Sequence, residues 1–208
     1  KRNDLLLNVL NSLWNEFETE DEFESLFESI YECAIERHEM SSYLAEFMLC
    51  SMLKRLNHLN MNQLLEHTMK SILERLKNCV FRTKFDTNEC YILLILLETG
   101  ISEFNQNQVL IHMQTIIELI SKTIQNLNAE LRFVSLHVLI QIWIQIKTFH
   151  QDTTEFMVFI NQNFISTQIQ LFKVYIDRIQ NTNACTNSHQ THTTTPTRNL
   201  LRQKHAKL

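Results

Sequence analysis

The side chains with the clearest chemical potential form an acidic segment near the start of the chain. Between Glu16 and Glu39 the sequence holds ten acidic residues and one base, Arg37. Four of these acids recur at intervals of four residues, which places them in one line along a helix. We call this line the acidic row, and it consists of Glu24, Glu28, Glu32 and Glu36. Like charges at this spacing repel by roughly 0.2–0.5 kcal/mol per pair, so nothing in the helix itself needs the row. It indicates either a solvated face or a docking surface for a basic partner.

Aromatic side chains near the acidic row are candidates for anchoring such a partner. Aromatic residues bury a large area at small entropic cost and often dominate protein interfaces. We expect three of them to be exposed beside the row: Trp14, Phe17 and Tyr31. The expected partner is a protein with a basic or helical peptide segment.

Basic residues gather in a link between two expected helices, residues 77–84, and again at the end of the chain. Neutralisation of phosphates by such residues is the main source of non-specific nucleic-acid affinity. The candidates for phosphate contact are Lys77, Arg82, Lys84, Arg198, Arg202 and Lys204. The chain as a whole is acidic, with a formal net charge of -4, and no zinc finger or RNA-recognition motif accompanies these bases. Nucleic-acid association is therefore the alternative to protein binding.

Catalytic and metal-binding chemistry finds little support in the remaining reactive side chains. Cys185, His189 and His192 lie close in sequence, but a segment rich in Thr and Asn offers no rigid second shell for zinc. The other four cysteines lie mostly on apolar stripes, as core cysteines do: Cys33, Cys50, Cys79 and Cys90. A single glycine excludes phosphate-cradling loops and the serine elbow of hydrolases. We expect no catalytic residue, no metal and no cofactor.

The elements that position these side chains are predicted to be helices throughout. The 208 residues are 44% hydrophobic and include one glycine and one proline, too few for the tight turns of a sheet. About eight amphipathic segments follow from the spacing of apolar residues. The first covers residues 4–18, and the second begins at the capping pattern 19–22. The next three begin near residues 42, 60 and 87. The last three cover 106–126, 128–146 and 152–179, and a break is expected near Ser166. Gly100 is expected to end or kink the fifth helix.

The composition changes abruptly after residue 180. Residues 181–197 are nearly all Asn, Thr, Ser, Gln and His, and residues 198–208 are short and basic. We therefore predict a helical domain over residues 1–180 and a polar, basic tail over 181–208. The longest apolar run, Tyr91–Leu97, is far shorter than the roughly 20 residues that cross a bilayer. With no signal peptide and irregularly spaced cysteines, we expect an intracellular protein, cytoplasmic or nuclear, without a membrane segment.

The order of the segments is similar to that of helical repeats. If the helices are paired from the first, the pairs begin near residues 4, 42, 87 and 128, at intervals of about 38, 45 and 41 residues. Asn128–Leu139 resembles the HEAT pattern, with Arg132 and Ser135 at matching positions, although no unit has the usual proline. A resemblance to HEAT and armadillo repeats implies antiparallel pairs in a right-handed α-α superhelix. It also implies a non-catalytic protein–protein interaction scaffold or adaptor, or one segment of a larger helical-repeat subunit. An irregular helical bundle is the alternative fold.

Overall fold

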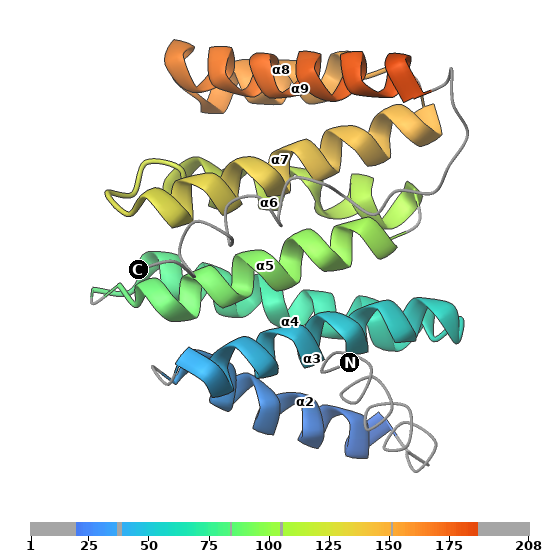
Figure 1. Cartoon of the computed structure of the whole chain (residues 1–208), viewed down its shortest axis with the longest axis vertical. Coiled ribbons are helices and arrows are strands. Elements are labelled where there is room, and N and C mark those ends of the chain that lie inside the picture. Colours follow the sequence, from blue (N-terminus) through green and yellow to red (C-terminus); the bar gives the residue numbers. More distant parts are fainter. Residues whose placement is uncertain (1–19, 37–38, 84, 105, 151, 187–208) are drawn as a thin grey trace. The chain divides into compact units, whose positions relative to one another are not determined.

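The structure, a computed structural model, has helices as its only regular secondary structure in the residues that it describes (Figure 1). The described residues are 20–36, 39–83, 85–104, 106–150 and 152–186. Eight helices follow one another in these ranges: α2 (Glu20–Ile35), α3 (Glu39–His58), α4 (Asn62–Phe81), α5 (Thr87–Glu103), α6 (Gln106–Thr123), α7 (Ala129–His150), α8 (Thr154–Asn163) and α9 (Ser166–Thr186). The predicted all-α class is confirmed, and so is the break near Ser166. The helix expected over residues 4–18 lies outside the described residues.

The chain divides into two compact units, Lys1–Ile169 and Gln170–Leu208. Most of α9 belongs to the second unit. This helix continues to Thr186, so the predicted start of the tail at residue 181 falls inside a helix. Once a helix is established, each further residue adds one backbone hydrogen bond, which lets the polar residues 181–186 continue it.

Consecutive helices of the first unit form antiparallel hairpins, and the hairpins stack so that their helices lie in two layers. The most extensive contacts between consecutive helices are α2 with α3, α4 with α5, and α6 with α7. Between hairpins, α3 packs on α5 and α5 on α7 in one layer, while α4 packs on α6 and α6 on α8 in the other (Figure 1). The hairpins begin at Glu20, Asn62 and Gln106, intervals of 42 and 44 residues. The pairs are thus one helix out of phase with the predicted pairing.

The core of the first unit is centred on α5, which is apolar around its whole circumference. It packs against α2, α3, α4 and α7, so every residue from Ile92 to Leu97 is buried. α7 is buried in a similar way on two sides. Among the described helices, α7 alone is long and apolar enough to cross a membrane by length and composition. More than half of that apolar window is buried inside the protein, so the core accounts for its composition.

Gly100 lies inside α5 and does not end or kink it, contrary to the sequence prediction. The helix continues to Glu103, and the glycine has no positive φ. A Cβ atom at this position would lie 2.5 Å from Cε of Met69 and closer still to its Sδ. Met69 on α4 is fully buried. A side chain at this position would therefore require the end of the Met69 side chain to move.

The two residues that match the HEAT pattern make contacts at the turn between α6 and α7. Nη1 of Arg132 donates to the carbonyl oxygens of Asn126 and Leu127, at 2.9 and 2.7 Å. The hydroxyl groups of Ser135 and Thr123 lie 2.7 Å apart in the buried interface of the two helices. Both residues thus join α6 to α7, and neither contact depends on a ligand.

Candidate functional site

The acidic row lies along α2 on the side away from the core. The opposite, buried face of this helix carries Phe23, Phe27, Ile30, Tyr31 and Ala34. α2 has six acidic residues and no basic one, so its charge is uncompensated within the helix.

The first half of the acidic row is paired with side chains of α4. Oε1 of Glu24 lies 3.3 Å from Nε2 of His67, and Oε1 of Glu28 lies 2.6 Å from Nη2 of Arg75. These contacts join α2 to α4 across the surface of the first unit. These contacts could not be predicted from the sequence, because α3 separates the two helices along the chain.

The second half of the acidic row is free. Glu32 and Glu36 are exposed, and within the described part of the chain their side chains make no hydrogen bond or ion pair. Glu32 lies in the last turn of α2 and Glu36 directly follows its last residue, where the helix dipole adds partial negative charge. This end of α2 therefore presents the unneutralised charge of the row.

Tyr31 is buried, contrary to the expectation of an exposed aromatic anchor. Only 3% of its surface is accessible, because it shares the core stripe of α2 with Phe27 and Ala34. Its hydroxyl donates to Oε1 of Glu89 at 3.4 Å, and the guanidinium of Arg75 lies 4.8 Å from its ring centroid. Burial, followed by the charge of Glu89, raises the pKa of the Tyr31 hydroxyl far above its usual value. The other two expected anchors, Trp14 and Phe17, lie outside the described residues.

The basic candidates for phosphate contact are not brought together in the described structure. Nη1 of Arg82 lies 2.8 Å from Oε2 of Glu89, so its charge is balanced within the protein. Lys77 is exposed on α4. The remaining candidates lie outside the described residues: Lys84, Arg198, Arg202 and Lys204.

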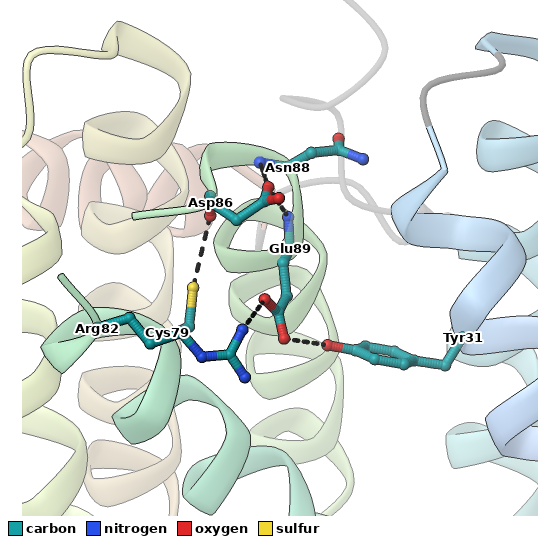
Figure 2. A network of polar contacts seen from close by, with 6 residues as sticks. All are labelled: Tyr31, Cys79, Arg82, Asp86, Asn88 and Glu89. Carbon is teal, nitrogen blue, oxygen red and sulfur yellow. Dashed lines mark hydrogen bonds and ion pairs between the residues drawn. The ribbon is translucent and has the colours of Figure 1, made fainter. Parts of the chain in front are cut away.

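Tyr31 and Arg82 meet in a polar network at the ends of three helices (Figure 2). Glu89 in the first turn of α5 accepts from both of them, which links α2 and α4 to α5. Asp86 caps α5, since its Oδ1 accepts from the backbone N–H groups of Asn88 and Glu89 at 2.9 and 3.1 Å. The sequence predicts this cap from the spacing of Asp86 and Glu89, but not the partners from α2 and α4.

The carboxyl end of α2 is closed by side chains from two other helices. Nδ2 of Asn88 donates to the carbonyl oxygen of Ile35 at 2.6 Å. The hydroxyl of Ser42 on α3 donates to the carbonyl of Ala34, also at 2.6 Å. These bonds satisfy carbonyl groups that the last turn of a helix leaves without partners. They hold the free end of the acidic row in a fixed position on the first unit.

Two buried thiols lie beside the same network. Sγ of Cys79, in the last turn of α4, donates to the carbonyl oxygen of Asp86 at 3.4 Å (Figure 2). Cys90, in the first turn of α5, is buried nearby, and its backbone N–H donates to the same carbonyl oxygen at 3.1 Å. The sequence suggests core cysteines at both positions, but not their proximity.

Metal-binding geometry does not occur in the part of the chain that the structure describes. No group of three or more His, Cys, Asp or Glu side chains is arranged there to hold an ion.

Comparisons with known proteins assign no relationship to this chain. No family model matches it, and neither the curated proteins nor the solved structures include a match.

Proposed function

We propose that this chain is a non-catalytic protein–protein interaction scaffold or adaptor of HEAT- or armadillo-like helical repeats. The interval of 42 and 44 residues between its hairpins is in the range of two-helix repeat units. Layers of stacked hairpins of this kind offer long surfaces to protein segments. The same architecture suits one segment of a larger helical-repeat subunit.

The observation that carries the proposal is the free carboxyl end of the acidic row. Glu32 and Glu36 are exposed and unpaired among the described residues, while Glu24 and Glu28 are engaged with α4. Unpaired like charges on a fixed helix end lower the local stability and attract cations from solution. A partner with a basic segment would relieve this repulsion. We therefore place the partner's basic residues against Glu32 and Glu36.

The test uses the double variant Glu32→Lys with Glu36→Lys. Reversal at Glu24 or Glu28 would also break their contacts with His67 and Arg75, so those positions are left unchanged. Immobilised wild-type and variant proteins are compared by affinity capture with quantitative mass spectrometry. We expect capture of the main partner to fall at least about tenfold, because attraction is replaced by repulsion.

A matched control distinguishes the effect of the position of the charge reversal from the effect of the change in net charge. Glu74→Lys with Asp177→Lys makes the same change in net charge at two other exposed helix positions. This control should capture the same partner as the wild type. Equal losses in both double variants, or no loss in either, would contradict the proposal.

Nucleic-acid association has less support. Arg82 is exposed but balanced by Glu89, which leaves Lys77 as the one candidate without an ion pair among the described residues. A gel-shift titration with single-stranded and duplex DNA at low salt distinguishes the two functions. The scaffold proposal predicts no shift, whereas a shift that weakens steeply with salt would favour nucleic-acid binding.

A further inference from the structure

The end of α4 and the start of α5 bring two buried thiols together. Cys79 lies in the last turn of α4 and Cys90 in the first turn of α5, and neither side chain is accessible to solvent. The Cys79 thiol and the backbone N–H of Cys90 donate to the same acceptor, the carbonyl oxygen of Asp86, at 3.4 and 3.1 Å, so the two cysteines are neighbours. Cys33 and Cys50 differ from this pair, because Cys33 is exposed and Cys50 accepts a hydrogen bond from Thr99.

We propose that Cys79 and Cys90 are a dithiol site that hydrogen peroxide converts reversibly into a disulfide. The bond would join two helix ends that already pack against each other, across ten intervening residues. The site is separate from the acidic row, so this proposal goes beyond the scaffold function.

The oxidation has two steps. In the first, the Cys79 thiolate attacks one oxygen of the peroxide, the O–O bond breaks, and the products are a sulfenic acid and, after protonation of the leaving hydroxide, water. In the second, the sulfur of Cys90 attacks the sulfenic sulfur, the S–O bond breaks, and a second water leaves with the proton of Cys90. The two thiols lose two electrons and two protons in total, and the peroxide is reduced to water. A small thiol such as reduced glutathione reverses the reaction by exchange.

The environments of the two sulfur atoms assign their roles. The interaction with the Cys90 thiol, with smaller contributions from the Asp86 backbone and the charge of Arg82, lowers the pKa of the Cys79 thiol against the opposing effects of burial and of Glu89. The interaction with Cys79, together with burial, raises the pKa of Cys90. Since the thiolate is the nucleophile, Cys79 is the residue that reacts with peroxide, and Cys90 resolves the sulfenic acid.

The position of the pair at helix ends gives the oxidant a route to it. Phe81, the last residue of α4, is 66% exposed, and Arg82 and Thr83 after it are exposed as well. Terminal turns of helices open locally at a lower cost than unfolding of the whole protein. Opening of the last turn of α4 exposes Cys79 while α5 stays packed in the core.

The experiment treats the full chain with hydrogen peroxide, blocks the remaining thiols with iodoacetamide, and digests it with trypsin under non-reducing conditions. Trypsin cleaves after Lys77, Arg82, Lys84 and Lys122, so the two cysteines fall in separate peptides, residues 78–82 and 85–122. We expect these peptides to appear as one linked species, two hydrogen atoms lighter than their sum. Dithiothreitol should separate them.

Two variants sharpen the test. Cys33→Ser with Cys185→Ser should form the same linked species at the same peroxide concentration. Cys90→Ser should leave Cys79 as a sulfenic acid that dimedone labels. Complete alkylation of Cys79 after peroxide treatment of the wild type, its overoxidation without a link, or a link to Cys33 or Cys50 would each overturn the proposal.

Discussion

Gly100 shows how one residue type decides the packing of two helices. In the interior of a helix, glycine is less favourable than alanine by roughly 0.5–1 kcal/mol, so it persists here against the local preference of the chain. The gain that outweighs this cost is the close approach of α5 to Met69 on α4. The sequence predicts a helix end or a kink at this glycine, because a single chain reveals where glycine occurs but not what lies opposite it.

The Gly100→Ala substitution should destabilise the protein by about 1–2 kcal/mol, since an overpacked core costs more than the helix gains. Met69 is fully buried and has little room to move away. In a Met69→Ala background the same substitution should stabilise by up to about 1 kcal/mol, because the cavity accepts the new methyl group. Urea unfolding of the four proteins in this cycle measures both effects. A substitution effect of the same sign in both backgrounds would contradict the proposed contact.

The burial of Tyr31 shows why the exposure of an aromatic side chain is hard to predict from sequence. It is close to the acidic row along the chain, yet it lies on the apolar stripe of α2, and position on the stripe decided its burial. The stripe itself was readable from the sequence. Its hydrogen bond to Glu89 was not, because a residue of α5 supplies the partner.

At the scale of elements, helix starts were more predictable than helix contacts. The start of α5 followed from Asp86 and Glu89, and the start of α7 from Asn128, whose Oδ1 accepts from the N–H groups of Glu130 and Leu131. Such caps are local chemistry between residues a few positions apart. The side-chain contacts that join α2 to α4 connect distant segments, so no local pattern encodes them.

Asp86→Ala should lower the free energy of unfolding by about 1 kcal/mol, because two backbone N–H groups at the start of α5 lose their acceptor. Asp86→Asn keeps an oxygen at the same position and should lose much less. Thermal or urea denaturation of the three proteins provides the measurement. If alanine and asparagine have the same effect, the cap contributes nothing to stability.

At the scale of the whole molecule, the all-α class followed from composition and periodicity. Whether each helix forms a hairpin with the helix before it or with the helix after it could not be predicted in this way. Short polar links let a helix pack against either sequence neighbour, and the choice depends on which faces are apolar. α5 and α7 are apolar on more than one side, so they pack on each other in addition to their hairpin partners.

The same difference in burial predicts a gradient of local stability. Amide hydrogen exchange should be slowest in α5 around Ile92–Leu97 and in α7 around Val138–Ile142, and clearly faster in α2. Exchange monitored by mass spectrometry over minutes to hours tests this order. Protection of α2 equal to that of α5 would mean that the first unit opens as a single cooperative block.

The central position of α5 in the core also affects how the chain folds while it is being synthesised. α5 ends at Glu103, but α7, which covers one of its faces, ends only at His150, 47 residues later. At ribosomal rates of about 5–20 residues per second, that apolar face waits roughly 2–9 s for its cover. During this interval the nascent chain presents an apolar surface of the kind that chaperones bind. Variants that slow the docking of α7 will therefore aggregate during synthesis, even when their folded state remains stable.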